Sequence, residues 1–293
     1  CWKMTGEMSV GIVFVESSRS GGPTFTTSER NDVCNEIVTG LNWLASLHPG
    51  ASLTWVYDMQ FISIDVADGD NASTEEYWRD PAMTRVNYRG ATYTGTWASV
   101  AEYREDMRVA NRSDHAFVIF VTPYGNEWHA YAGGGRITLA RRNDWGGWGR
   151  GTLDIITAHE TSHLFGAADE YTGSGTPCNT CGSTHGCDNI PNGNCGSCAS
   201  PQESCAMDDN VDVALIGAGM CNAVLCAFGT QNQPQGIMPA LFGSPWAIPY
   251  GDVGAITFMG HLMRRQMYEH GLESLDYAHI AVTTSPPTAP AIV

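Results

Sequence analysis

Residues 158–171 constrain the fold more than any other part of the sequence, because they combine a helical pair of histidines with a turn. Their sequence is AHETSHLFGAADEY. His159 and His163 are four residues apart, so on a helix both imidazoles lie on one face and can reach the same ion. Glu160 follows the first histidine and is placed to take a proton from a metal-bound water. The segment therefore predicts a helix that carries a metal site.

Gly166 predicts the end of this helix, because glycine readily adopts the left-handed conformation that closes many helices. The chain can then turn back and bring Asp169 to the metal as a third ligand, with the adjacent Glu170 as the alternative. Three protein ligands leave a fourth position for water, as a catalytic zinc site requires. The competing interpretation is a helix with two incidental histidines and a solvated glutamate.

The segment from His159 to Asp169 resembles the extended zinc motif of the metzincin clan, HExxHxxGxx followed by a third ligand. Most members have histidine at the third position, and Asp169 stands there as in the snapalysin-like members. The longer string also resembles secreted bacterial proteins with the pattern AHExGHxFGAxDEY. The resemblance implies a zinc metallopeptidase with a zincin fold, in which His159, His163 and Asp169 bind zinc and Glu160 is the general base.

The resemblance also implies an edge strand that pairs with an extended substrate and a methionine turn beneath the metal. Met207 is the first candidate for that turn, and Met238 is the alternative. The expected edge strand comprises Arg136, Ile137, Thr138, Leu139 and Ala140.

The clan's usual tyrosine shortly after the methionine turn has no match after Met207. Tyr171, Tyr250 or His261 is then left as the group that polarises the substrate carbonyl.

The hydrophobic pattern before the motif predicts alternating strands and helices, hence an α/β arrangement with a twisted mixed sheet. Two β-branched runs, SVGIVFV and AFVIFV, are typical of buried strands. Thr152 is the expected N-cap of the helix that carries the motif. The expected strands are 9–15, 53–64, 116–121 and 136–140, the helices 28–47, 96–111 and 153–165, and the loops 65–80 and 145–151.

After the motif the composition changes and the hydrophobic periodicity is lost. This change predicts a metallopeptidase domain over residues 1–282 with two subdomains. The N-terminal subdomain spans 1–166 and holds the sheet. The C-terminal subdomain spans 167–282, is irregular and rich in cysteine, and ends in a helix at 252–270. Residues 283–293 form a Pro/Thr-rich linker or tail.

Ten cysteines are present, and eight of them lie between Cys178 and Cys226. An even, dense set in a loop-rich stretch favours disulfides and therefore an oxidising compartment. The alternative is a second zinc site, because Cys178-x-x-Cys181 and Cys195-x-x-Cys198 resemble zinc knuckles.

The formal net charge of −16 makes nucleic acid an unfavourable partner, because an acidic surface repels phosphate. No apolar run reaches the roughly 18 residues that a membrane helix needs. Asp and Asn side chains between Asp188 and Asp212 offer many oxygen ligands, so structural calcium is an alternative to simple solvation. We expect a protein that is secreted, extracellular or at the cell surface.

The sequence thus favours a secreted zinc-dependent endopeptidase that hydrolyses peptide bonds through a zinc-bound water with Glu160 as general base. The alternative is a structural or adhesive surface protein that retains a zincin fold. The substrate is a protein or peptide whose identity, like the oligomeric state, the sequence leaves open.

Overall fold

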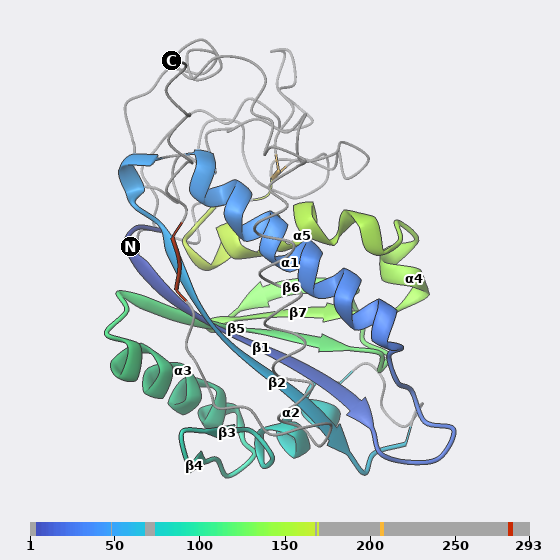
Figure 1. The fold of residues 1–293 in the computed structure, drawn as a ribbon. Coiled ribbons are helices and arrows are strands. Elements are labelled where there is room, and N and C mark those ends of the chain that lie inside the picture. Colours follow the sequence, from blue (N-terminus) through green and yellow to red (C-terminus); the bar gives the residue numbers. More distant parts are fainter. Residues whose placement is uncertain are drawn as a thin grey trace, which may run out of the picture.

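The computed structural model describes residues 4–47, 49–67, 74–167, 169, 206–207 and 281–283. Within these residues, helices cover both faces of a six-stranded sheet, so the architecture is a three-layer α/β/α sandwich (Figure 1). This arrangement confirms the predicted mixed α/β fold. Residues 170–205 and 208–280 hold most of the predicted C-terminal subdomain, and that prediction lies outside the described residues.

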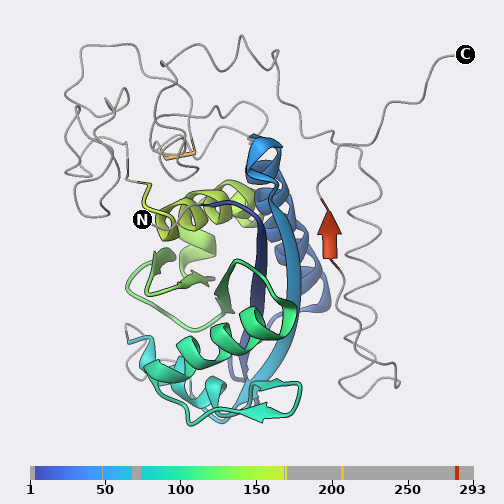
Figure 2. The ribbon, with the colours of Figure 1, turned by 90° about the vertical axis from the view of Figure 1, so that its left-hand side faces the viewer.

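The sheet is mostly parallel, and its strand order is β6-β7-β5-β1-β2-β8. The four inner strands run parallel to one another, whereas each edge strand is antiparallel to its neighbour. Figure 2 shows β8 at the edge opposite to β6 and β7. The strands are β1 (Glu7–Ser17), β2 (Thr54–Ile64), β5 (His115–Thr122), β6 (Ala130–Gly133), β7 (Arg136–Ala140) and β8 (Ala281–Thr283).

Strand β1 lies at the centre of the sheet because both of its faces are apolar. Ile12 and Phe14 belong to the hydrophobic core on one side, and Val13 and Val15 belong to the core on the other. A strand buried on both faces needs this continuous apolar run, which is what the sequence SVGIVFV supplies. Burying each such side chain contributes about 1.5–3 kcal/mol to folding.

Two helices cover each face of the sheet. Helices α1 (Thr27–Leu47) and α5 (Leu153–Leu164) pack on one face, and α2 (Glu76–Met83) and α3 (Trp97–Asn111) on the other (Figures 1 and 2). Helices α1 and α5 also pack against each other. The remaining short elements are the 3₁₀ turns Pro49–Ala51 and Arg150–Thr152, the hairpin strands β3 (Asn87–Tyr88) and β4 (Ala91–Thr92), and α4 (Asn143–Gly146).

Within the described residues, the predicted long helices and strands are confirmed to within about two residues, and the short elements account for the errors. Residues 65–80 were expected to be a loop, but α2 begins at Glu76 and buries Trp78. Residues 145–151 were expected to be a loop, but they contain the end of α4 and the start of a 3₁₀ turn. Strand β6 and the hairpin β3–β4 were missed, because elements of two to four residues have too few positions for a periodicity.

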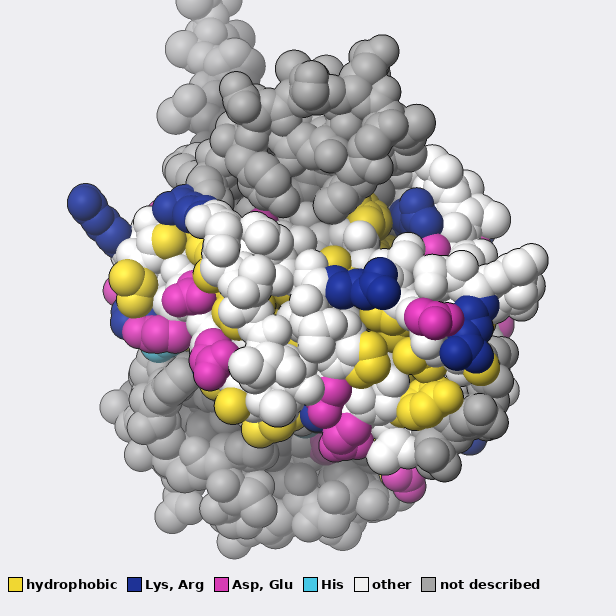
Figure 3. All heavy atoms as spheres, turned by 90° about the horizontal axis from the view of Figure 1, so that it is seen from below, with side chains coloured by type: hydrophobic (Ala, Val, Ile, Leu, Met, Phe, Trp, Pro, Cys, Tyr) yellow, Lys and Arg dark blue, Asp and Glu magenta, His cyan; other side chains and the backbone are white. Residues whose placement is uncertain are grey.

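The face formed by α2, α3 and the hairpin β3–β4 carries interspersed acidic and basic side chains, as seen in Figure 3. Among the described residues, no helix is both long enough and apolar enough to cross a bilayer. Cys34 is a buried free thiol in α1, whereas the cysteines from Cys178 to Cys226 lie outside the described residues, and with them the predicted disulfides. Thr283, the first residue of the predicted tail, is the last residue of β8.

Candidate metal centre

Helix α5 is held in place by its apolar face. Ile155, Ile156 and Ala158 are buried in the core between the sheet and α1. Gly40 of α1 allows the close approach, because a Cβ at this position would lie 2.2 Å from the carbonyl oxygen of Asp154. The position of the helix is therefore set by the packing of its apolar face.

The beginning of α5 differs from the prediction. Thr152 occupies the N-cap position, but its hydroxyl donates to the carbonyl oxygen of Gly149 and caps no helical N–H. In the first turn, the N–H of Ile155 donates to Oδ1 of Asp154 at 2.7 Å. The backbone N–H of Asp154 also favours the charged form of Glu36 in α1, which lies near this end of the helix.

The end of α5 follows the prediction. Gly166 has φ of +95°, a conformation that glycine adopts without a steric penalty. The N–H of Gly166 donates to the carbonyl oxygen of His163, and the N–H of Ala167 donates to that of Ser162. This reversal directs the chain back along the helix, so that Asp169 reaches the histidines.

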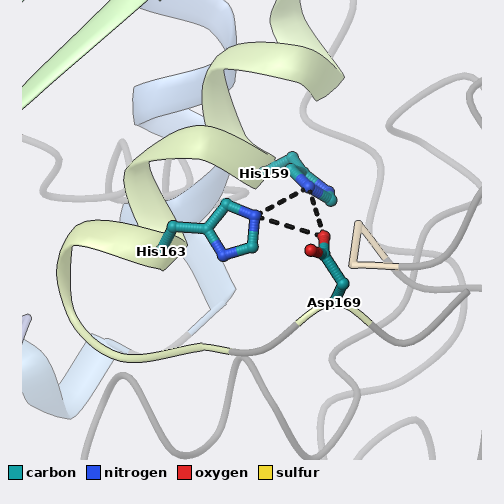
Figure 4. Close-up of side chains that lie close together, drawn as sticks. All are labelled: His159, His163 and Asp169. Carbon is teal, nitrogen blue, oxygen red and sulfur yellow. Dashed lines mark hydrogen bonds and ion pairs between the residues drawn. The ribbon is translucent and has the colours of Figure 1, made fainter. Parts of the chain in front are cut away.

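Three ligand atoms converge on one point, as Figure 4 shows. The two Nε2 atoms of His159 and His163 are 3.0 Å apart, and one oxygen of Asp169 lies 3.0 Å and 3.2 Å from them. Donor atoms about 2.0–2.1 Å from a tetrahedral zinc ion would be about 3.3 Å from one another. The triangle therefore has nearly the size that such an ion requires.

The remaining ring nitrogens fix the tautomer of both histidines. Nδ1 of His159 lies 2.6 Å from the carbonyl oxygen of Ala206, and Nδ1 of His163 lies 2.9 Å from that of Ala167. A carbonyl oxygen only accepts hydrogen bonds, so each Nδ1 carries a proton. In the neutral ring, Nε2 then presents its lone pair to the common point, which is the usual arrangement of histidines that bind metals.

The electrostatics of the triangle favour a positive charge at its centre. Burial lowers the pKa of His163, but hydrogen bonding to Asp169 and the charges of Glu160 and Asp169 outweigh burial and raise it to about 9. Burial likewise raises the pKa of Asp169, but hydrogen bonds from both imidazoles hold it well below its usual range. A proton and a metal cation would therefore compete for the same place.

Glu160 lies beside the triangle with little access to solvent. Its side chain is 7% exposed. Burial raises its pKa, the charges of His159 and His163 oppose that rise, and Asp169 adds to it. A carboxylate in such an environment is a better proton acceptor than one in water.

Met207, the first candidate for the methionine turn, lies in the hydrophobic core, and the turn itself stays a prediction. It is fully buried in the same hydrophobic cluster as Ile155 and Ala158, and Ala206 before it supplies the carbonyl oxygen to His159. The other candidates that the sequence offered lie outside the described residues. These are Glu170, Tyr171, Met238, Tyr250, His261 and the acidic residues from Asp188 to Asp212.

The predicted edge strand is wrong in its position. Arg136–Ala140 forms β7, which is an inner strand between β5 and β6. The edge belongs to Ala130–Gly133, the antiparallel strand β6, which packs against α5. Four half-buried residues, of which three are glycine or alanine, give too weak a pattern for the sequence to have shown this strand.

Sequence reasoning also missed His129, which directly precedes β6. Burial lowers its pKa, and the charges of His159 and Arg142 lower it further. A lone histidine without a ligand spacing carries no signal in the sequence.

The segment between β7 and α5 contains an unusual backbone turn. Asn143, Asp144 and Trp145 all have φ between +49° and +59°, and Gly146 and Gly147 continue the left-handed run. Each such non-glycine residue costs about 1–2 kcal/mol. Trp145 offsets this strain, because it is 1% exposed and stacks on Phe25 with a ring distance of 6.2 Å.

Comparison with known proteins adds no family to these observations. No protein-family model matches the chain, and no curated protein matches its sequence.

Proposed function

We propose that this chain is a zinc-dependent endopeptidase with a metzincin-like site. The observation that carries the proposal is the triangle of His159, His163 and Asp169, with both Nδ1 atoms engaged by backbone carbonyls. Two imidazoles and one carboxylate are a donor set that suits zinc, and three protein ligands are typical of catalytic sites. A zinc ion bound there would supply Lewis-acid chemistry to a substrate carbonyl.

The protein's own groups would carry out the proton transfers. Glu160 accepts a proton from the attacking water as the water oxygen forms a bond to the scissile carbonyl carbon. The same carboxyl then returns that proton to the amide nitrogen as the carbon–nitrogen bond breaks. The buried position of Glu160, 7% exposed, suits both steps, because its raised pKa lies closer to neutrality than that of a solvated glutamate.

A structural role for the metal explains this arrangement less well. A purely structural site has no need for Glu160, and burying a carboxylate raises its pKa because the charged form is unfavourable there. An acid placed beside three ligand atoms in spite of this penalty favours a catalytic site.

The experiment combines elemental analysis of the purified full chain with cleavage of casein, with and without a chelator. We expect about one zinc per chain and cleavage that the chelator abolishes. Glu160→Gln should retain the zinc and lose at least about 100-fold in kcat, the lower range for loss of a general base. Substantial cleavage by that variant would overturn the role of Glu160, and a chain that binds no zinc would overturn the proposal.

A further inference from the structure

The outer edge of β6 lies beside the proposed zinc helix. Strand β6 is the last strand of the sheet on this side, and α5 packs against it. The carbonyl oxygen of His129 accepts a hydrogen bond from the N–H of Ala140, so the ladder extends one residue before β6. Within the described residues no strand pairs with the outer edge, whose backbone groups are those that an extended peptide binds.

His129 and Trp148 form an aromatic pair next to the first residue of β6. The rings of His129 and Trp148 meet edge to face, with centroids 4.8 Å apart and planes at 88°. The backbone of Gly146 lies against the same imidazole, because a Cβ there would come within 2.9 Å of it. The indole of Trp148 is nevertheless 42% exposed, so a large part of an apolar ring faces solvent beside the edge strand.

Backbone contacts on both sides position this pair. Trp148 directly follows the left-handed turn at residues 143–147, which is anchored by the buried ring of Trp145. The guanidinium of Arg142 donates to the carbonyl oxygens of Asn126 and Glu127, and so ties the loop that carries His129 to the loop that carries Trp148. Strained backbone that the surrounding structure maintains is typical of functional sites.

Burial, together with the charges of His159 and Arg142, lowers the pKa of the His129 imidazole and so disfavours its charged form. A neutral ring beside an exposed indole makes an apolar surface. Aromatic side chains pack on such a surface edge to face or offset-stacked, with a gain beyond the burial of area alone.

We infer that His129 and Trp148 form a subsite for an aromatic side chain of a peptide that pairs with β6. The inference rests on the proposed peptidase function and adds the substrate class: extended chains with Phe, Tyr or Trp at one position. Trp128 is the matched control, since it is 62% exposed and adjacent to His129 in the chain, but is not the ring partner of that histidine.

The test measures peptide binding without turnover. Labelled, capped octapeptides of Thr, Ser and Ala carry a single Phe that is moved from position to position. Their affinities for the full chain with Glu160→Gln are measured by fluorescence anisotropy. We expect one position at which Phe binds about tenfold more tightly than Ala. Adding Trp148→Ala should abolish that difference, Trp148→Phe should retain most of it, and Trp128→Ala should leave it unchanged.

Three results would overturn the subsite. The first is the absence of a preferred Phe position, and the second is a preference that survives Trp148→Ala in a variant with unchanged melting temperature. The third is an octapeptide with Arg at the preferred position that binds as tightly as the one with Phe. Casein cleavage by the chain with Glu160 intact is measured in parallel. Cleavage without a Phe preference refutes the subsite alone, whereas a Phe preference without cleavage refutes the peptidase proposal alone.

Discussion

The two ends of α5 hold carboxyl groups in opposite electrostatic states. At the beginning of the helix, burial and the charges of Asp154 and Asp32 raise the pKa of Glu36 to about 7, although the N–H of Asp154 stabilises its charge. Burial alone raises the pKa of Asp154 to about 6. At the far end, two imidazoles hold the pKa of Asp169 well below its usual range.

The difference shows that partners, rather than burial, decide the state of a buried acid. Burial opposes the charged form at both ends, and only the C-terminal end supplies enough hydrogen-bond donors to reverse that effect. Glu36 borders a hollow of about 480 Å³ whose other charged lining residues are Asp32, Asp144 and Arg150, and Arg150 pairs with Asp32. Only the C-terminal end therefore combines a carboxylate with ligands that suit zinc.

The largest expected effect is a difference in zinc affinity between substitutions at the two ends of α5. Asp169→Asn removes a ligand and should weaken zinc binding by more than about 100-fold, the upper range for loss of a partner outside the ligand shell. Asp144→Asn, beside the N-terminal hollow, should leave the affinity unchanged. Competition titrations with a chromophoric chelator measure both. Equal losses in the two variants would remove the distinction between the ends.

The next effect concerns how α5 is held. Gly40→Ala places a Cβ 2.2 Å from the carbonyl oxygen of Asp154, so α1 and α5 must separate. Overpacking of this kind should lower the free energy of unfolding by about 1–3 kcal/mol. Gly151→Ala is the control, because no atom lies within 4 Å of its Cβ. Urea denaturation distinguishes the two variants, and an equally stable Gly40→Ala protein would contradict the packing.

The third effect tests the competition between proton and metal. The pKa of His163 is about 9 without a metal, so at lower pH its Nε2 must lose a proton when zinc binds. Zinc affinity should then rise about tenfold per pH unit between pH 7 and 9. Calorimetry in buffers of different ionisation enthalpy measures the proton released. Release of no proton at pH 7 would contradict the raised pKa.

The smallest effect tests the N-terminal end alone. Because the folded pKa of Glu36 is raised, its contribution to stability is greatest below about pH 4.5 and declines as pH rises through about 7. Glu36→Gln should therefore raise the melting temperature by roughly 2–4 °C at pH 8 and by nothing at pH 4.5.

Glu29→Gln on the same helix is the opposite control. Burial raises the pKa of Glu29, but hydrogen bonds from Thr26 and Arg141 outweigh it and lower that pKa. Its charge therefore stabilises the fold above about pH 4.5, so this substitution should lower the melting temperature at pH 8. Shifts of the same sign in both variants would contradict the assignment of the two environments.

Local patterns explain which parts of the protein were predicted correctly. The central strand β1 has an apolar run, α5 has its histidines at a spacing of four, and Gly166 stands where the turn requires a positive φ. Each of these features is encoded in a few consecutive residues. They were sufficient to predict that His159, His163 and Asp169 come together, as the structure shows.

The features that were missed depend on contacts between distant residues. The edge position of β6 is decided by strand order, and the approach of Glu36 to the beginning of α5 depends on how α1 packs. The loop that carries His129 is tied by Arg142 to the loop that carries Trp148.

The sequence by itself determined the chemistry of the site, because the spacing of a helix and one glycine turn bring His159, His163 and Asp169 together with little help from the rest of the chain. Only the tertiary structure decided how those groups are oriented. The carbonyl oxygen of Ala206, 47 residues after His159, engages Nδ1 and directs Nε2 to the common point. No local pattern specifies such a contact, because a backbone carbonyl is present at every residue and only the packing of the core selects one of them.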